Sequence, residues 1–201
     1  MSEATKIPSD RRQHIIDVSI TCFSRTGYHN TSMTDIADAV GVTKPVLYQH
    51  FDSKRALYLE ILRFVGQALV TAVTSNAATS SDGREQTERA MIAYFTWVNE
   101  HRDAFALLFE SSERVDEEFA TTVREFEEAA SSAIAPLITV DLPEDSRRTL
   151  AMALVGMVEA VSRHVIAQGT PFDSGALGTE LAGLAWGGLR SLGQSRNTQP
   201  R

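Results

Sequence analysis

Residues 41–51 read GVTKPVLYQHF, and this stretch decides the fold that we expect for the chain. Gly41 is a natural end for one helix, because glycine enters the left-handed region of backbone space without strain. Thr43 can cap the next helix through its hydroxyl, and Pro45 fits in a first turn, where N–H groups have no partner inside the helix. Two short helices joined by so tight a turn predict a helix-turn-helix.

The residues before Gly41 supply the rest of the motif. Ser32 and Asp35 have the spacing of a capping box, which begins a helix. Apolar residues then recur at helical spacing at Met33, Ile36, Ala37 and Val40. An earlier helix is expected between a Ser9–Asp10 start and Gly27, with one apolar face formed by Ile15, Val18, Ser19, Cys22 and Phe23. The sequence therefore predicts three helices before residue 52.

The second helix of the motif has the mixed surface that reading DNA requires. Leu47 and Phe51, four residues apart, can anchor it, which leaves the other side chains for the major groove. Contacts to phosphate are expected from lysines and hydroxyls at helix starts, namely Thr31, Ser32, Thr43, Lys44 and Lys54. Contacts to base edges or thymine methyls are expected from Pro45, Val46, Gln49 and His50. The alternative is a solvated helix face.

Charge is distributed unevenly along the chain, although its total is −7. Residues 1–60 carry seven basic and seven acidic side chains, whereas the remainder carries 12 basic against 19 acidic ones. All three lysines lie before residue 55. This pattern fits an N-terminal part that faces a polyanion, with chance clustering as the alternative.

The remaining sequence is helical in pattern, so we expect an all-α protein. A long apolar stripe from residue 57 to 72 ends at SNAATSSDG, residues 75–83. Later helices are expected at 84–101, 103–112, 116–138, 144–168 and 174–193. The predicted organisation is a disordered arm over 1–8, a helix-turn-helix domain over 9–55, an effector-binding and dimerisation domain over 56–193, and a disordered tail over 194–201.

Several classes of protein are disfavoured by what the sequence lacks. A single cysteine excludes an intramolecular disulfide, and no secretory signal opens the chain, so the cytoplasm is the expected compartment. The most apolar segment, residues 149–167, is interrupted by Glu159, Arg163 and His164, which disfavours a membrane span. No nucleophile elbow, P-loop, H-E-x-x-H or C-x-x-C is present. We therefore expect no catalytic residue, no metal and no cofactor.

Two further surfaces are expected in the second domain. Apolar side chains recur on one face of three successive helices and predict an apolar effector cavity, with a solid core as the alternative. The expected lining is Met91, Phe95, Phe105, Leu108, Phe109, Phe119, Val123 and Phe126. The glycine-rich segment 174–193 costs helix propensity, which close packing across a two-fold dimer interface would offset. The expected seam is Leu154, Met157, Val158, Val161, Leu184, Trp186 and Gly187, with ordinary intrachain packing as the alternative.

Residues 27–62, GYHNTSMTDIADAVGVTKPVLYQHFDSKRALYLEIL, resemble the tetracycline-repressor (TetR) family of bacterial regulators. The resemblance implies a three-helix DNA-binding domain, a linking fourth helix, and a helical domain that dimerises and binds a small effector. It also implies a homodimer on a pseudo-palindromic operator. By resemblance, Thr43, Lys44, Tyr48 and Lys54 correspond to backbone-contacting positions, and Pro45, Val46 and His50 correspond to positions near bases.

Short segments resemble one subset of that family more closely. KPVLYQHF (44–51), LLFE (107–110) and AWGGL (185–189) look like the actinobacterial regulators that sense long-chain acyl-CoA and control fatty acid synthesis. Arginines that could then pair with the nucleotide phosphates are Arg89, Arg102 and Arg124. A repressor of efflux genes that binds cationic drugs is the alternative, with Glu110, Glu113 or Glu159 as counter-charge, and an all-α enzyme is a remote one.

Overall fold

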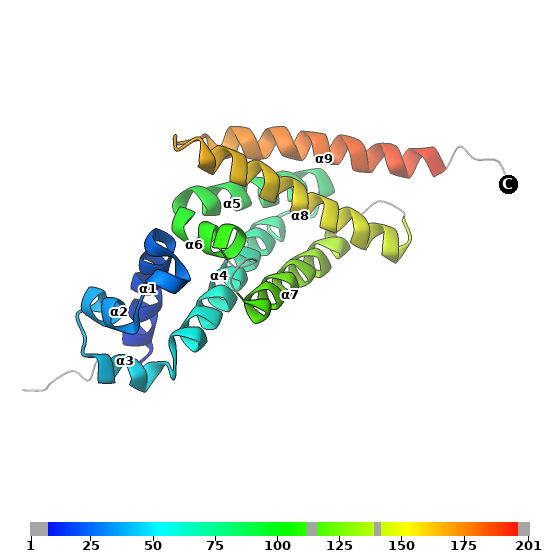
Figure 1. The fold of residues 1–201 in the computed structure, drawn as a ribbon. Helices are drawn as coiled ribbons and strands as arrows, with labels where there is room; N and C mark the ends of the chain where they lie inside the picture. The colour runs from blue at the N-terminus through cyan, green and yellow to red at the C-terminus, as the bar shows by residue number, and fades with distance from the viewer. Residues whose placement is uncertain (1–7, 112–115, 139–141, 197–201) are drawn as a thin grey trace, which may run out of the picture. The chain divides into compact units, whose positions relative to one another are not determined.

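The computed structural model describes residues 8–111, 116–138 and 142–196, and every regular element in these ranges is helical (Figure 1). The prediction of an all-α fold is confirmed. The elements are α1 Pro8–Asn30, α2 Met33–Val40, α3 Lys44–His50, α4 Lys54–Ala77, α5 Gly83–Glu100, α6 Arg102–Ala106, a π-helical turn Leu107–Ser111, α7 Glu117–Ile134, a 3-10 turn Ala135–Leu137, α8 Glu144–Ala167 and α9 Ser174–Arg196.

The chain divides into two compact units, and the division cuts through α4 and α7. The first unit comprises the residues up to Val65 together with Asp103–Val123. The second unit comprises Gly66–Arg102 and the residues from Arg124 onward. A separate DNA-binding domain over 9–55 therefore remains a prediction, because the first unit also includes α6 and the start of α7. The expected tail over 194–201 overlaps α9, which reaches Arg196, and 1–7 and 197–201 lie outside the described residues.

Local signals in the first unit act as the sequence predicted. Ser32 and Asp35 form the capping box of α2, with the Asp35 N–H 3.1 Å from the Ser32 hydroxyl and the Ser32 N–H 2.8 Å from the Asp35 carboxylate. Gly41 ends α2 at φ 76°, where its N–H bonds back into the last turn. Gly27 interrupts α1 at φ 77°, after which one more helical turn follows.

The core of the first unit contains the two residues that anchor α3. Leu47 is fully buried and Phe51 is 3% exposed, so both expected anchors are confirmed. Arg12 of α1 forms an ion pair with Glu60 of α4, and its guanidinium lies 4.7 Å from the centre of the Phe51 ring. The short helix α3 is therefore held by its apolar face, with α1 and α4 supporting it.

In the second unit, α5 and α9 share the most extensive contact. A Cβ added at Gly178 of α9 would lie 2.7 Å from the main-chain nitrogen of Ile92 in α5. Gly178 therefore lets α9 approach α5 closely within one chain. This contact fits the alternative expectation that the glycine-rich segment 174–193 packs within its own chain. A smaller cluster of Ile138, Ala151 and Leu189 joins α8 and α9.

Two helices, α4 and α8, are long and apolar enough to cross a membrane by length and composition alone. Core helices of soluble proteins pass the same test. For α4 half of the apolar window is buried within the chain, whereas for α8 only 17% is. Most residues of the α8 window are therefore not fully buried within one chain.

The segment expected as a helix over 103–112 differs in detail. It begins as α6 and continues as a π-helical turn over Leu107–Ser111. Leu107, Leu108 and Phe109 are consecutive and all buried, and no narrow face of an α-helix would hold all three.

Candidate nucleic-acid interface and effector region

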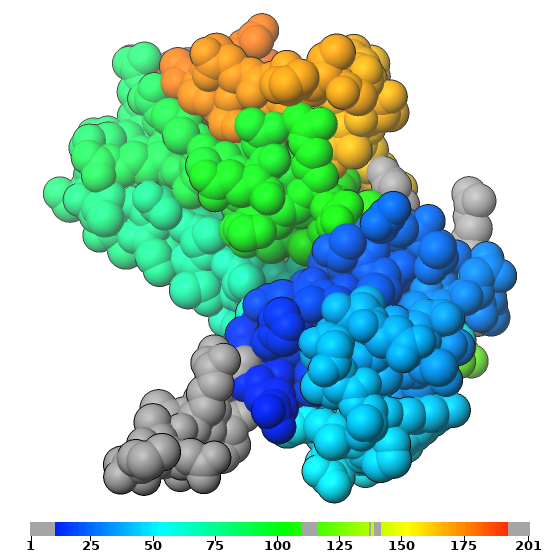
Figure 2. Space-filling view, turned by 90° about the vertical axis from the view of Figure 1, so that its left-hand side faces the viewer, coloured from blue at the N-terminus to red at the C-terminus, as the bar shows by residue number. Residues whose placement is uncertain are grey.

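The outer side of α3 carries the side chains expected to read DNA. Tyr48 is 42% exposed, whereas its neighbour Leu47 is fully buried. The other residues of α3 that are expected to contact DNA are exposed or half-buried, namely Lys44, Pro45, Val46, Gln49 and His50. Helices α2 and α3 contact each other and lie together on the surface, in light blue and cyan in Figure 2. The sequence-predicted base-reading residues are thus brought together on one short helix.

The start of α3 differs from the expectation at one point. Thr43 has the extended backbone of an N-cap residue, but its hydroxyl makes no capping hydrogen bond. The expected side-chain cap is therefore wrong, and only the Thr43 carbonyl serves the helix, accepting the Leu47 N–H at 3.1 Å. Pro45 sits in the first turn as predicted.

The start of α2 presents a polar surface beside α3. Ser32 is exposed, and hydrogen bonds to the Asp35 carboxylate, first from the Ser32 side chain and then from its main-chain N–H, lower the pKa of the Asp35 carboxyl. A negative Asp35 stabilises the first turn through the helix dipole. The same carboxylate would oppose a phosphate placed directly on this turn, so a contact from Ser32 must approach from the side.

Thr31 and Lys54, the other two expected phosphate contacts, are engaged within the fold. Thr31 is 2% exposed, and its hydroxyl donates to the Gly27 carbonyl at 2.8 Å. The Lys54 ammonium donates to the main-chain oxygens of Tyr28 at 2.7 Å and Thr31 at 2.9 Å. It therefore fastens the start of α4 to the end of α1. A phosphate role for either residue stays a prediction.

An aromatic cluster lies beneath this junction. The Phe119 ring centre is 4.9 Å from that of Tyr28 and 4.7 Å from that of Tyr58. Arg55 binds Asp116 at 2.9 Å and also pairs with Glu118, and the bond from Arg55 is the main cause that lowers the pKa of Asp116. The start of α7 is thus packed and ion-paired onto the helices of the first unit.

The eight residues expected to line an effector cavity fall into both units. Those in the first unit are Phe105, Leu108, Phe109, Phe119 and Val123, all of which are buried. Those in the second unit are Met91, Phe95 and Phe126. Phe126 packs on α4, where a Cβ added at Gly66 would lie 2.7 Å from its ring. No described unit holds all eight, so the expected cavity stays a prediction.

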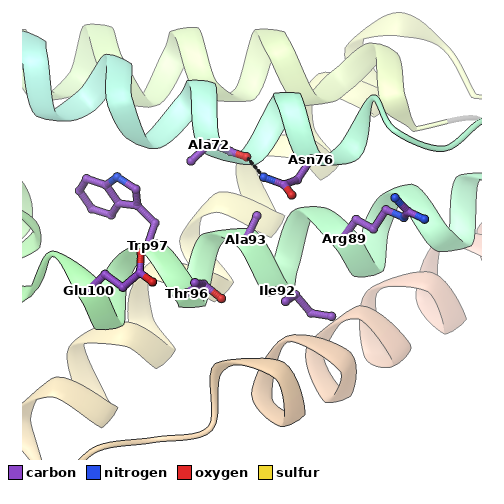
Figure 3. Close-up of a pocket in the computed structure, with 8 residues that line it drawn as sticks. All are labelled: Ala72, Asn76, Arg89, Ile92, Ala93, Thr96, Trp97 and Glu100. Carbon is purple, nitrogen blue, oxygen red and sulfur yellow. Dashed lines mark hydrogen bonds between the residues drawn. The ribbon is translucent and has the colours of Figure 1, made fainter.

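A pocket of about 330 Å³ lies between α4 and α5 in the second unit (Figure 3). It is lined by Ala72, Asn76, Arg89, Ile92, Ala93, Thr96, Trp97 and Glu100. Trp97 and Glu100 stand at one end and Arg89 at the other. Arg89 donates to Glu85 at 3.1 Å, so its charge is already partly matched. None of the eight expected lining residues borders this pocket, whose residues follow a second stripe along α5, and of that stripe the sequence had singled out Arg89 alone.

The expected dimer seam lies in the second unit and is partly uncovered. Leu184 is 65% exposed, and Val158 is buried within the chain. A Cβ added at Gly187 would meet no atom within 4 Å. The remaining members are half-buried, namely Leu154, Met157, Val161 and Trp186. Neighbouring apolar residues add to the exposed surface, because Met152 is 59% and Leu192 44% exposed.

The carboxylates considered as counter-charges give little sign of a cationic site. Glu159 forms an ion pair with Arg163, one turn further along α8. The side chains of Glu110 and Glu113 lie outside the described residues. Among the residues with described positions, no cluster of three or more His, Cys, Asp or Glu side chains could hold a metal ion.

Comparison with known proteins matches both parts of the chain. Residues 15–61 match the family described as bacterial regulatory proteins, tetR family, and residues 83–188 match the tetracyclin repressor-like C-terminal domain. The HTH-type transcriptional activator FasR of Mycolicibacterium smegmatis is 32% identical over 195 residues, covering 96% of this chain and 89% of FasR. This relative agrees with the resemblance to actinobacterial regulators.

Solved structures show the same fold. A TetR-like transcriptional regulator from Rhodococcus sp. RHA1 is 28% identical with a TM-score of 0.75, covering 92% of this chain and 99% of that one. The regulator FadR of Bacillus subtilis, solved in complex with stearoyl-CoA, has a TM-score of 0.76 at 14% identity, covering 86% of this chain and 96% of that one. At that identity the second comparison shows the fold alone.

Proposed function

The chain belongs to the tetR family of bacterial regulatory proteins and is a DNA-binding transcriptional regulator, not an enzyme, and we propose that long-chain acyl-CoA controls its binding to an operator. The proposed form is a cytoplasmic homodimer on a pseudo-palindromic site, acting on genes of lipid or fatty acid metabolism. The observation that carries the DNA-binding part is the outer face of α3, where the buried anchors Leu47 and Phe51 leave Lys44, Tyr48 and Gln49 exposed.

On this surface, each side chain has a chemical role in the proposal. Lys44 supplies a charge to phosphate, and the Tyr48 and Thr43 hydroxyls add hydrogen bonds that set the position of the helix. His50 and Gln49 reach base edges, while Pro45 and Val46 contact thymine methyl groups. Ser32 adds a phosphate contact from α2. Lys54 and Thr31 act mainly by holding the ends of α1 and α4, as their hydrogen bonds support.

The proposed dimer uses the uncovered apolar surface of α8 and α9. Large apolar side chains exposed together on a single chain indicate an interaction surface. Leu184 and Met152 are the most exposed of these, and the glycines at 183, 187 and 188 leave room for close approach of a second chain. A two-fold axis through this surface would place two copies of α3 for two half-sites.

Two observations and one energetic argument support the acyl-CoA assignment. The expected lining residues are apolar, and several of them are aromatic and buried. A long acyl chain would gain about 0.8 kcal/mol for each methylene it buries. Solved proteins of the same fold include the fatty acid degradation regulator FadR of Bacillus halodurans and the stearoyl-CoA complex of its Bacillus subtilis namesake. The residues proposed to contact the chain are Met91, Phe95, Phe105, Leu108, Phe109, Phe119, Val123 and Phe126.

The DNA-binding part is tested by selecting bound sequences from a pool of random duplexes with the purified full-length protein. The expected result is a pseudo-palindrome whose half-site centres are about one helical turn, or a multiple of it, apart. A matched selection uses the triple variant Lys44→Ala, Tyr48→Ala, His50→Ala, which should enrich no sequence. If this variant enriches the same site, residues outside α3 read the DNA sequence.

A further inference from the structure

Among the described residues of the second unit, two fully buried hydroxyl groups have no hydrogen-bond partner. They are the Tyr94 hydroxyl of α5 and the Ser162 hydroxyl of α8, two helices that contact each other. Tyr94 is 8% exposed and Ser162 is fully buried. A buried hydroxyl without a partner costs free energy, because it has lost its bonds to water without replacement. Neither residue belongs to the expected effector set.

Ser162 stands apart from the other buried serine and threonine residues in the described parts of the chain. Each of the others donates to the main-chain carbonyl four residues earlier, in the pairs Ser19 to Ile15, Thr31 to Gly27, Thr122 to Glu118 and Ser131 to Glu127. This local bond is the usual way for a helical serine to satisfy its hydroxyl. Ser162 does not make it, so its O–H remains available to a group outside α8.

The surroundings of the two hydroxyls determine which kind of ligand group they can bind. Burial raises the pKa of Tyr94 far above its usual range, so the phenol keeps its proton and acts as a donor. The Ser162 hydroxyl lies within hydrogen-bonding reach of the Tyr94 hydroxyl and lowers that pKa, although no formed hydrogen bond joins the two, and the charge of Glu159 raises it. A carboxylate placed here would meet both burial and the charge of Glu159, although Arg163 pairs with that charge. A neutral acceptor meets neither obstacle.

We propose that Tyr94 and Ser162 form a polar anchor for the neutral carbonyl oxygen of an apolar ligand. A carbonyl oxygen has two lone pairs and can accept one hydrogen bond from each hydroxyl. Because it rests on the proposed function, the anchor is assigned to the thioester carbonyl of a long-chain acyl-CoA. It discriminates against the free fatty acid, whose carboxylate is charged. The hydroxyls thereby fix the position of the thioester, and the acyl chain extends from it.

The test compares two ligands that differ only at the carbonyl. Stearoyl-CoA carries the thioester, and S-octadecyl-CoA is the thioether with the same number of carbons and no carbonyl. Calorimetric titration of the wild type should show about tenfold tighter binding of the thioester, the value expected for two buried hydrogen bonds. The double variant Tyr94→Phe, Ser162→Ala should bind both ligands alike. The control Ser131→Ala, which removes a satisfied buried hydroxyl, should keep the wild-type preference.

Thermal unfolding without ligand gives an independent readout. Tyr94→Phe should melt at the wild-type temperature or above it, since the variant removes an unpaired buried hydroxyl. A lower melting temperature, or an unchanged thioester preference in the double variant, would overturn the anchor. If the wild type binds neither ligand, the acyl-CoA assignment fails, and the melting temperatures still decide whether the hydroxyls are unpaired.

Discussion

The ammonium of Lys54 lies 2.7 Å from the main-chain oxygen of Tyr28 and 4.4 Å from the centre of the Tyr28 ring. One side chain thus satisfies the carbonyls at the end of α1 and lies over an aromatic face. Cations are favoured at this position both by the helix dipole and by the ring. The first residue of α4 therefore fastens this helix to the end of α1.

This geometry separates the effects of two lysines. Lys54→Ala should lower the free energy of unfolding by about 1 to 3 kcal/mol, because carbonyls of α1 lose a charged donor. Lys44→Ala should leave stability unchanged and lower the salt slope of DNA binding by about 1. Denaturant unfolding and salt-dependent binding measure the two effects. The opposite pattern, with Lys54→Ala stable and its salt slope reduced, would make Lys54 a phosphate contact.

His50 should read a base. Replacing it by alanine should cost about 1 to 3 kcal/mol on the selected operator and relax the preference at one position. Fluorescence anisotropy on the operator and on a scrambled duplex gives the comparison, with Gln49→Ala as the neighbouring variant. If His50→Ala weakens both duplexes equally, His50 does not discriminate between bases.

Gly178 should be needed for packing within one chain. Gly178→Ala would push a methyl group against the main chain of Ile92, an overpacking that typically costs about 1 to 3 kcal/mol. At Gly183 an added Cβ meets no atom within 4 Å of the same chain, so Gly183→Ala is the matched control. Thermal unfolding should show a loss for the first variant only. Equal stability of Gly178→Ala and the wild type would contradict the close approach of α5 and α9.

The uncovered surface of α8 and α9 should be the dimer interface. Gly187→Glu would bury an unpaired carboxylate there, which costs on the order of several kcal/mol. Sedimentation at micromolar concentration should then show a monomer with unchanged helix content. Leu184→Glu, on the same helix, should act in the same way. A stable dimer of both variants would place the interface elsewhere.

The helix-turn-helix could be predicted from sequence because its signals are local. The capping box at Ser32 and Asp35 and the glycine end at Gly41 each involve residues a few positions apart, and the structure confirms them. The cap at Thr43 failed because a capping residue type does not ensure that its hydroxyl turns toward the helix. The buried anchors of α3 were predictable from a spacing of four.

The effector region was less accessible to sequence reasoning. Apolar spacing marks Phe95 and Phe119 as buried but does not tell a cavity wall from a packed core, and the two fall in different units. Gly178 shows the same limit, since its close partner Ile92 lies on a distant helix. Tyr94 and Ser162 were missed because their lack of partners depends on the side-chain directions of two helices far apart in sequence.

The central claim is tested most directly by titrating the preformed complex of protein and operator with stearoyl-CoA. Only a ligand that binds the DNA-bound and free forms with different affinity can shift the equilibrium. We predict that stearoyl-CoA changes operator affinity, and that acetyl-CoA at the same concentration does not, because its acyl chain buries almost no methylene groups. Operator affinity that stays constant at saturating stearoyl-CoA, but changes with a cationic aromatic drug, would contradict the account and indicate a regulator of efflux genes.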